Sequence, residues 1–580
     1  MPVAPAVANA VFDEPNMTTN MEIDRREFLK RTSRSGAALM IGFYLPAAVW
    51  GKEIADRRPF APNAWIRITT DNQITVLTEI PEMGQGARTV DTMILADELE
   101  ADWSTIRIEQ APVIPETYQN LATGGSGGTE RAWNYMRNVG AQAREMLLTA
   151  AAQQWGVEKK SCRAENGTVV HGASGRRAKY GEFVETASKL PVPDARSIRL
   201  KPPSEFRFIG KPVPRVDVPS KVDGTALFGI DVRAPGMLFA VIARCPHFGG
   251  RLQTFDATTA KAVPGVCAVF PVAPLGPLPK LERNVNTAGG VAVVAESTWS
   301  AIKGRRALKI SWDKGPNGFE STETLQKKLK EQASGPPTFV AVNLGDVLKA
   351  LEKAPRRVDA VYELPFQAHA TMEPMNTTMH VREDGIEVWS PTQIGAGVQE
   401  EVASLAGIPA KQVTVHMTLC GGSFGRRYQW DYVAEAWQVA KEVKRPVQLL
   451  WTREDDMQHD FYRQYAYYRL SGGIDAEANL VVWSQRVVST PIRTVFDTPE
   501  KLKDPARCLA RARGCGCSAL RCLQLSFGLC PGRLRRPTCL VALRRGFPQC
   551  FCDRELCRRT GACRWSRPLR VSPEAVAGRS

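Results

Sequence analysis

Residues 420–427 read Cys-Gly-Gly-Ser-Phe-Gly-Arg-Arg, and this stretch says most about the fold. Taken alone, glycines at this spacing are also typical of a tight turn. Two other stretches accompany it: residues 367–374 read Gln-Ala-His-Ala-Thr-Met-Glu-Pro, and residues 451–457 read Trp-Thr-Arg-Glu-Asp-Asp-Met, with Arg463 close behind. A lone His369 is more often structural than a ligand, so the information lies in the three stretches together and in this order.

Two more glycine-rich stretches lie nearer the amino terminus. Residues 82–86 read Glu-Met-Gly-Gln-Gly, and residues 122–129 read Ala-Thr-Gly-Gly-Ser-Gly-Gly-Thr and lead into a helix predicted to run through Trp155. A loop of this kind that opens a helix presents unpaired N–H groups to an anion, so phosphate binding and a flexible linker are both open interpretations. The stretch is neither a P-loop nor G-x-G-x-x-G, so no ordinary nucleotide fold is indicated.

Hydrophobic periodicity predicts an α+β chain of several domains. Two strands are expected within residues 63–77, around a turn at Asp71-Asn72, and a helix over 92–100. Later strands are expected at 229–232, 237–244, 266–271, 290–295 and 309–312, helices at 257–262 and 297–307, and linkers at 202–219 and 315–337. The predicted divisions are a signal region 1–55, an N-terminal domain 60–200, a middle domain 215–315, a third domain 336–498 and a tail 501–580.

The composition separates the tail from the rest. The chain has 580 residues, 43% hydrophobic, and a net charge of +16, of which residues 1–500 carry only +2. Residues 501–580 hold 10 of the 14 cysteines and a net charge of +14. No apolar run reaches the roughly 18 residues of a membrane-spanning helix, so no integral membrane segment is expected.

An export signal is expected near the amino terminus. Residues 24–30 read Asp-Arg-Arg-Glu-Phe-Leu-Lys and precede a mildly apolar stretch over 36–49, which resembles a twin-arginine leader. A short basic amphipathic helix is the alternative. The leader predicts a periplasmic protein exported in the folded state.

The glycine, glutamine and arginine stretches together resemble the molybdenum-binding large subunit of the xanthine dehydrogenase/aldehyde oxidase family. The branch of isoquinoline 1-oxidoreductase beta subunits is the most similar, because it carries a twin-arginine leader and a Met-Gly-Gln-Gly motif, as at 83–86. Arg426 and Arg427 replace the Gly-Lys pair of the xanthine branch and favour this assignment. The resemblance implies a molybdenum-hydroxylase-like fold, with a hammerhead-like α/β middle domain.

The resemblance also implies a chemistry and a set of site residues. Family enzymes hold molybdenum through a pterin dithiolene, with no protein ligand to the metal, and hydroxylate an N-heteroaromatic compound or aldehyde with water as the oxygen source. Gln367 would donate to the oxo ligand, and Arg463 would orient the substrate or stabilise negative charge. Phe424 and Gly425 would bring backbone N–H groups to the metal's oxygen. Residues implied to bind a molybdopterin cytosine dinucleotide are Gly84, Gln85, Gly86, Gly124, Gly125, Ser126, Gly127, Gly128, Gly422, Ser423, Phe424, Gly425 and Arg426.

Two expected parts of such an enzyme have no match in this chain. No C-x2-C spacing of an iron–sulfur domain occurs, so [2Fe–2S] clusters on a separate small alpha subunit are implied as the electron acceptor. No Gly-Val-Gly-Glu motif occurs either, so no general base is assigned; Glu373 matches a structural or substrate-side position. Cys420 is expected to be a small buried residue.

The tail has two interpretations. Its ten cysteines lack paired zinc-ligand spacing and all six histidines precede residue 460, which disfavours a zinc or nucleic-acid module. Abundant Arg and Cys with little Lys is typical of G+C-rich DNA read out of frame, and a shifted reading of residues 541–576 permits a helical, family-like segment. We therefore expect a one-base insertion near residues 500–508 and a non-native, irregular tail, which leaves an inactive truncated remnant as the alternative function.

Overall fold

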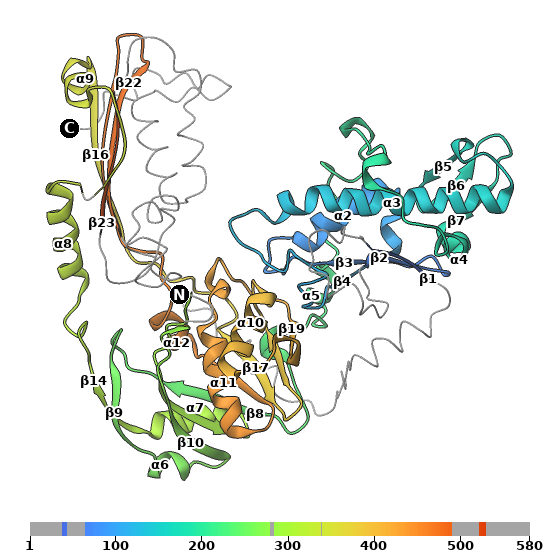
Figure 1. Cartoon of the computed structure of the whole chain (residues 1–580). Helices are drawn as coiled ribbons and strands as arrows, with labels where there is room; N and C mark the ends of the chain where they lie inside the picture. The colour runs from blue at the N-terminus through green and yellow to red at the C-terminus, as the bar shows by residue number, and fades with distance from the viewer. Residues whose placement is uncertain (1–37, 43–63, 279–282, 338, 490–520, 529–580) are drawn as a thin grey trace, which may run out of the picture. The chain divides into compact units, whose positions relative to one another are not determined.

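The structure is a computed structural model that describes residues 38–42, 64–278, 283–337, 339–489 and 521–528. The chain divides into two units (Figure 1). Unit 1 comprises residues 1–77, 91–109 and 133–214, and unit 2 comprises residues 78–90, 110–132 and 215–580. The two short segments that carry the glycine stretches 82–86 and 122–128 therefore belong to unit 2, with the stretch at 420–427.

Unit 1 is built on a four-stranded sheet in the order β1 (Ala38–Gly42), β2 (Ala64–Thr69), β3 (Ile74–Thr78) and β4 (Ile106–Gln110). The predicted turn between β2 and β3 is confirmed, with Asn72 at φ 68°. The other elements are helices α2 (Ala87–Leu99), α3 (Gly128–Trp155) and α4 (Val184–Ala187), and a small sheet of β5 (Cys162–Glu165), β6 (Thr168–His171) and β7 (Arg177–Lys179). The predicted helix through Trp155 is confirmed as α3.

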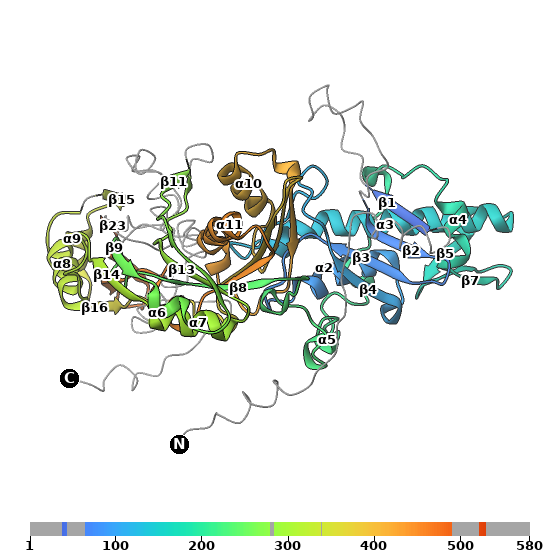
Figure 2. The same ribbon diagram turned by 90° about the horizontal axis from the view of Figure 1, so that it is seen from below.

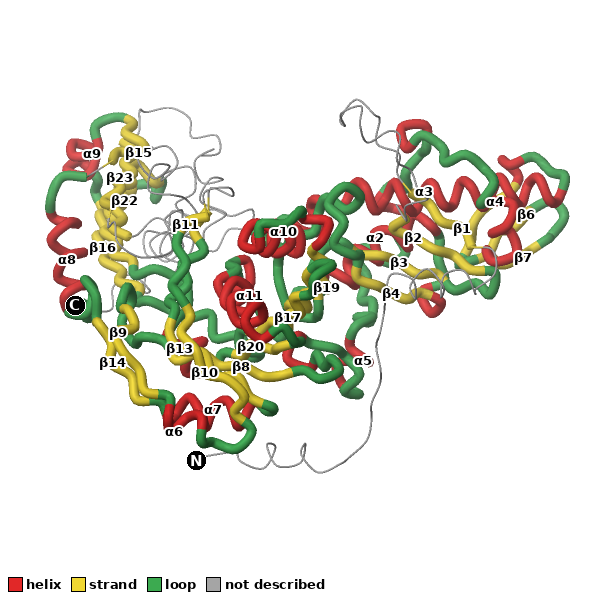
Figure 3. Tube along the Cα trace, turned by 60° about the horizontal axis from the view of Figure 1, so that its bottom comes forward, coloured by secondary structure: helices red, strands yellow, loops and turns green. Residues whose placement is uncertain are grey.

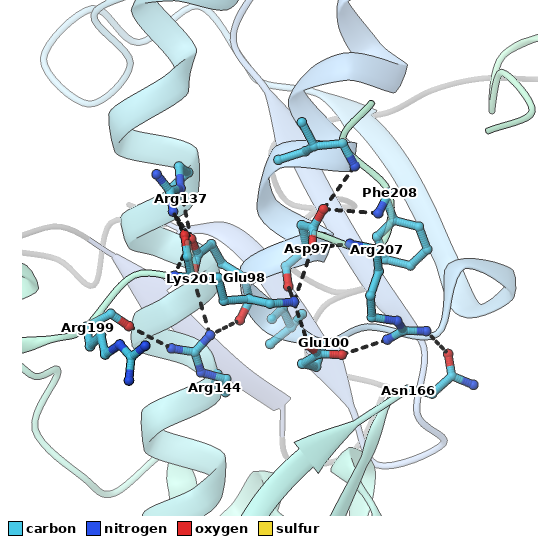
Figure 4. A network of polar contacts seen from close by, with 12 residues as sticks. Asp97, Glu98, Glu100, Arg137, Arg144, Asn166, Arg199, Lys201, Arg207 and Phe208 are labelled. Atoms are coloured by element: carbon cyan, nitrogen blue, oxygen red, sulfur yellow. Dashed lines mark hydrogen bonds and ion pairs between the residues drawn. The ribbon is translucent and has the colours of Figure 1, made fainter. Parts of the chain in front are cut away.

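A charge cluster closes unit 1 where α2 ends (Figure 4). We call it the α2 charge cluster; its members are Asp97, Glu98, Glu100, Arg137, Arg144, Lys201 and Arg207. The Asp97 carboxylate accepts the backbone N–H groups of Arg207, Phe208 and Ile209 at 2.9–3.0 Å. Lys201 Nζ lies 3.1 Å from Asp97 Oδ1. The proline-rich segment after Lys201, predicted as a linker, is thus held to unit 1 along its first part.

Unit 2 contains a seven-stranded sheet that joins strands from the predicted middle and third domains. Its order is β10 (Val266–Val272), β13 (Gly290–Ala295), β8 (Leu238–Ala243), β20 (Val447–Leu450), β17 (Asn376–Val381), β18 (Ile386–Ser390) and β19 (Val413–Met417). The parallel pairing of β8 with β20 joins the two segments. Helices α6 (Thr258–Lys261) and α7 (Thr298–Ala307) lie side by side against the β8–β13–β10 end (Figures 1 and 3). Helices α10 (Gly395–Ala406) and α11 (Asp431–Val443) lie side by side near its other strands (Figure 2).

A second sheet of unit 2 has five strands. Its order is β15 (Phe339–Leu344), β23 (Arg521–Gly528), β22 (Leu480–Ser489), β21 (Ala466–Ile474) and β16 (Arg356–Leu364). Helices α8 (Thr322–Ser334) and α9 (Val347–Lys353) contact this sheet, and Leu329 and Ala333 of α8 pack with Tyr465 and Val488. The remaining elements are α5 (Val218–Val222), α12 (Arg453–Gln458), the pair β9 (Arg251–Asp256) with β14 (Lys309–Asp313), and the pair β11 (Pro277–Leu278) with β12 (Arg283–Asn284).

Three sequence predictions are wrong. The expected strand at 229–232 is a 3-10 helix, Gly229–Asp231. The expected linker 315–337 contains α8, whose N-cap Ser321 accepts from Thr324 N and whose apolar residues recur four apart. The tail was expected to be irregular throughout, but Arg521–Gly528 form β23, paired antiparallel with β22. Its sequence, Arg-Cys-Leu-Gln-Leu-Ser-Phe-Gly, alternates apolar and polar residues with the period of a strand.

The α+β multidomain prediction is confirmed. Strands were correctly expected at β8, β10, β13 and β14, and helices at α6 and α7. None of the helices among the described residues is long and apolar enough to cross a membrane. The arginine pair of the leader and most of the tail lie outside the described residues; of the expected leader, only Ala38–Gly42 is described, as β1 antiparallel to β2.

Candidate cofactor site

Residues 82–86, the first glycine loop, are organised by a buried carboxylate. Glu82 Oε1 accepts from Gly84 N at 2.8 Å and Gly86 N at 3.0 Å, and Oε2 accepts from Arg88 N at 3.1 Å. Gly84 and Gly86 have φ values of 104° and 90°, which favour glycine. These two N–H groups are therefore engaged inside the protein, and the exposed outer side of the loop is Gly84 with Gln85.

Arg215 and Asp217, at the start of the last segment of unit 2, brace the first glycine loop. Arg215 Nη1 donates to Gly84 O at 3.1 Å, and its guanidinium pairs with Asp217 at 2.8 Å. Burial would raise the pKa of Asp217, but the hydrogen bonds from Arg215 and Lys221 lower it well below its usual range. The carboxylate therefore stays charged, and the loop is held by a paired arginine.

The first glycine loop is tied to residues 421–427, the third glycine loop. Cys420 N donates to Glu82 O at 3.3 Å, although the two residues are far apart in the sequence. The Cys420 thiol is buried, as expected, and burial raises its pKa to about 12. It is therefore a neutral packing residue and not a nucleophile.

Residues 122–128, the second glycine loop, run directly into α3. Gly125 and Ser126 are exposed and have φ values of 63° and 55°. A Cβ on Gly124 would come within 3.0 Å of the Tyr428 ring, so the loop passes closely over the end of the third glycine loop. The first N–H groups of α3 have no earlier helical carbonyl to bind, so this end of the helix can accept an anion.

Gln393 joins the second and third glycine loops. Its Oε1 accepts from Gly425 N at 3.1 Å, and its Nε2 donates to Thr123 O at 2.8 Å. The Gly425 N–H, which the resemblance implied at the metal's oxygen, is thus bound within the protein. Its own backbone accepts from Thr123 N at 2.8 Å and donates to Arg427 O at 3.1 Å. Sequence reasoning missed Gln393, because a single glutamine after a strand belongs to no recognisable pattern.

The third glycine loop rests on two buried arginines. Arg426 makes a bidentate pair with Asp431, both bonds 2.8 Å long, and its Nε forms an ion pair with Asp460 Oδ1 at 3.0 Å without hydrogen-bond geometry. Its guanidinium also lies over the rings of Trp451 and Phe461. Arg426 is thus a support beneath the loop, whereas the resemblance implied that it contacts the cofactor.

Arg427 anchors the same loop through Glu373. Arg427 Nη2 lies 3.2 Å from Glu373 Oε2, and Arg427 Nε donates to Gly422 O at 2.9 Å. Glu373 Oε2 in turn accepts from Gly421 N at 2.7 Å. Both side chains are buried, so Glu373 has a structural position and no free carboxylate oxygen to act as a base.

His369 lies beside Gly425 with its ring fixed by Asp460. His369 Nδ1 is 2.9 Å from Asp460 Oδ2, and a Cβ on Gly425 would lie 3.7 Å from His369 Nε2. Burial would raise the pKa of Asp460, but the hydrogen bonds from His369 and the charge of Arg426 lower it. We call the set beneath the third glycine loop the loop charge cluster; it consists of His369, Glu373, Arg426, Arg427, Asp431 and Asp460.

Gln367 and Arg463 lie together. Gln367 N donates to Arg463 O at 3.2 Å, and Arg463 N donates to Gln367 O at 2.9 Å, which makes a two-residue bridge. The Gln367 side chain is exposed. Arg463 Nη2 donates to Pro365 O at 3.1 Å, while its buried Nε has no hydrogen-bond partner in the part of the chain that the structure describes.

The outer side of the site is apolar and strained. Phe424 has φ 54° and is 72% exposed, and Met372 is 86% exposed. The Phe424 ring lies over Gly422, where a Cβ would approach it to 3.4 Å. A bulky residue at positive φ is uncommon, and such strain is found most often at ligand sites.

Within the described residues no group of three His, Cys, Asp or Glu side chains is placed to hold a metal ion.

Known protein families match the segments that contain the three glycine loops. A family model described as a molybdopterin cofactor-binding domain matches residues 331–490, and a second with the same description matches residues 18–213. Together they cover all three glycine loops, Gln367 and Arg463. The chain belongs to the xanthine dehydrogenase family of molybdopterin-binding proteins.

Relatives within the family are similar over most of this chain. It is 28% identical to the beta subunit of isoquinoline 1-oxidoreductase from Brevundimonas diminuta, over 79% of its length and 63% of that protein. It is 29% identical to a membrane-bound aldehyde dehydrogenase (pyrroloquinoline-quinone) of Gluconacetobacter polyoxogenes, over 78% of this chain and 59% of that protein. A nicotinate dehydrogenase subunit of Pseudomonas putida is 25% identical over 72% of this chain and 34% of that protein. The chain thus spans about three fifths of the length of the first two relatives.

Proposed function

We propose that this protein is the molybdopterin-binding subunit of an oxidoreductase that hydroxylates an N-heteroaromatic compound or an aldehyde. The observation that carries the proposal is the joining of three glycine loops from distant parts of the sequence in unit 2. The bond from Cys420 N to Glu82 O joins the first and third loops, and Gln393 joins the second and third. The names of the relatives, which include an isoquinoline oxidoreductase, an aldehyde dehydrogenase and a nicotinate dehydrogenase, support this substrate class.

The residues present fit a large cofactor with phosphate groups. Gly84, Gly422 and Gly425 all have positive φ, and a Cβ on Gly84 would meet nothing within 4 Å. Such loops let a ligand approach the backbone closely. The start of α3 behind the second glycine loop suits a phosphate, and a cytosine dinucleotide form of molybdopterin with molybdenum would place phosphates there.

The chain's own residues would bind the cofactor and orient the substrate. When bound, the molybdenum cofactor supplies the oxidation of a carbon centre with oxygen taken from water. The exposed Gln367 amide would donate a hydrogen bond at the metal end of the cofactor, next to Arg463, whose Nε has a free hydrogen in the described part of the chain. His369 Nε2 lies close to Gly425, and the exposed Phe424 and Met372 side chains would cover part of a bound cofactor and exclude water from it.

The electron acceptor and the cellular location belong to the same proposal. A separate small subunit with [2Fe–2S] clusters would take the electrons, and a twin-arginine leader would deliver the folded protein to the periplasm. Replacing Arg25-Arg26 by Lys-Lys should keep the protein in the cytoplasm, measured by fractionation and immunoblotting. Unchanged periplasmic delivery would contradict the leader.

Metal and pterin analysis with a dye-reduction assay tests the central proposal. We expect about one molybdenum and one pterin per chain, and reduction of an artificial acceptor with an N-heteroaromatic or aldehyde substrate, after the reading frame is restored and the small subunit is supplied. A frame-restored protein that binds no pterin would contradict the proposal. The inactive-remnant alternative, in which the chain binds cofactor or partner only weakly, predicts less than stoichiometric molybdenum and no turnover.

The reading frame itself is tested by resequencing the gene around codon 505. A one-base insertion near residues 500–508 is expected, and restoring the frame should recover cofactor and activity together. If the unmodified chain hydroxylates a substrate with normal molybdenum content, the frame hypothesis is wrong.

A further inference from the structure

A buried glutamine makes the contact between two loops that the sequence separates by nearly 300 residues. Gln393 is 2% exposed and follows β18, three residues after Ser390. Both polar atoms of its side chain are used: Oε1 accepts from Gly425 N at 3.1 Å, and Nε2 donates to Thr123 O at 2.8 Å. One amide group therefore connects the second glycine loop to the third.

We propose that Gln393 is a positioning residue that holds the second and third glycine loops in register for one cofactor. This inference rests on the proposed function. The second loop leads into the helix end suited to phosphate, and the third loop lies beside His369 at Gly425. A cofactor that reaches both needs the two loops at a fixed separation, and the Gln393 side chain sets that separation.

The glutamine amide is suited to both contacts. It offers an acceptor and a donor in one plane, whereas a carboxylate accepts only and a thioether makes neither bond well. The Gly425 N–H is committed to Gln393 Oε1, so its direction is set by the glutamine and not by the loop alone. Gly425 has φ 110°, a backbone conformation that favours glycine.

The backbone of Gln393 makes separate contacts that a substitution leaves in place. Its carbonyl accepts from Thr123 N at 2.8 Å, and its N–H donates to Arg427 O at 3.1 Å. A change of side chain therefore removes the two amide bonds without cutting the strand-like backbone connection between the loops. This allows the positioning role to be separated from the general support of the fold.

Gln448 offers a matched control. It is 1% exposed, and its Nε2 donates to Gly229 O at 3.2 Å and Ile230 O at 3.3 Å. It therefore also uses a buried amide to hold a backbone segment, the 3-10 helix Gly229–Asp231, but none of these contacts is with a glycine loop. Gln448→Met reports what the loss of a buried amide does to unit 2 in general.

The test compares Gln393→Met, Gln393→Glu and Gln448→Met in the full chain by hydrogen exchange with mass spectrometry. Gln393→Met should speed exchange about tenfold in peptides that cover 122–128 and 421–427, the effect of losing one ordinary hydrogen bond at each loop. Gln393→Glu should leave 421–427 protected, because its carboxylate still accepts from Gly425 N, and speed exchange only at 122–128. Gln448→Met should change neither peptide.

Cofactor release gives the second measurement, made on the frame-restored protein below its melting temperature. Gln393→Met should release pterin about tenfold faster than Gln448→Met at equal thermal stability. Equal release rates, or loop exchange that is unchanged or that rises equally in Gln448→Met, would overturn the positioning role. If the wild-type protein holds no pterin, the proposed function fails, and the exchange experiment alone then decides whether Gln393 couples the loops.

Discussion

The two units each bury a cluster of charges, but they use it differently. In the α2 charge cluster of unit 1, the carboxylates bind basic side chains and the backbone of residues 201–209. The cluster therefore holds this segment against the end of α2. In the loop charge cluster of unit 2, Arg426 and Arg427 support a loop whose outer residue, Phe424, is 72% exposed. Buried charge is therefore common to both units, and the exposed, strained loop above it distinguishes the candidate site.

The largest expected effect comes from the loop charge cluster. Arg427→Met should lower the free energy of unfolding by about 3–5 kcal/mol, because it leaves the buried Glu373 carboxylate without its cation. In the frame-restored protein it should also release the pterin. Denaturant unfolding and pterin analysis measure the two effects.

The matching change in unit 1 is Glu98→Gln. Glu98 is fully buried between Arg137 and Arg144, so a loss of similar size, about 3–5 kcal/mol, is expected. Pterin content should stay at the wild-type level in the fraction that remains folded. Equal loss of pterin from both variants would contradict the expectation that only the loop charge cluster supports cofactor binding.

Acid should affect unit 2 through His459, which contacts the Trp451 ring beside Arg426. Burial, and then the charge of Arg244, lowers the pKa of His459 to about 4. An unfolded histidine titrates near 6.5, so the folded state is favoured fully above about pH 6.5 and loses about 3 kcal/mol as the pH falls to about 4. The α2 charge cluster holds no histidine among its members.

His459→Gln should remove that part of the pH dependence. Denaturant unfolding at about pH 7 and pH 4 measures it as the difference between wild type and variant. An identical fall in stability in both proteins would show that His459 is not held neutral in the folded state.

The outer side of the site is tested by Gln367→Ala in the frame-restored protein. The Gln367 side chain is exposed, so its removal leaves no buried cavity, and stability and pterin content should be kept. Turnover should fall about 100-fold, as expected for the loss of one preorganised donor. Undiminished turnover would show that Gln367 is not at the reacting centre.

The smallest effect is expected at the solvent edge of the α2 charge cluster. The Arg207 side chain is 36% exposed and pairs with Glu100, so Arg207→Ala should cost less than about 1 kcal/mol. The backbone N–H of residue 207 still donates to Asp97 in the variant. A cost near that of Glu98→Gln would show that the exposed and buried parts of the cluster act as one unit.

Local pattern by itself determined much of this protein. The alternation in residues 63–77 predicted β2 and β3, and the glycine-rich start predicted α3, because strand and helix periods depend on near neighbours. The three motifs indicated the family. Helix α8 was also readable from its Ser321 cap and was missed, since the prolines and glycines around it were given more weight.

Tertiary structure alone decided how the site is assembled. Nothing in residues 82–86 shows that Glu82 O meets Cys420 N, and nothing around Gln393 shows that its amide joins Thr123 to Gly425. Arg426 was expected at the cofactor, but it lies beneath the third glycine loop. There it pairs with Asp431 and Asp460, and its guanidinium lies over the Trp451 ring. Contacts between residues hundreds of positions apart depend on the packing of whole sheets. The local sequence around one residue therefore does not predict which distant residue it contacts.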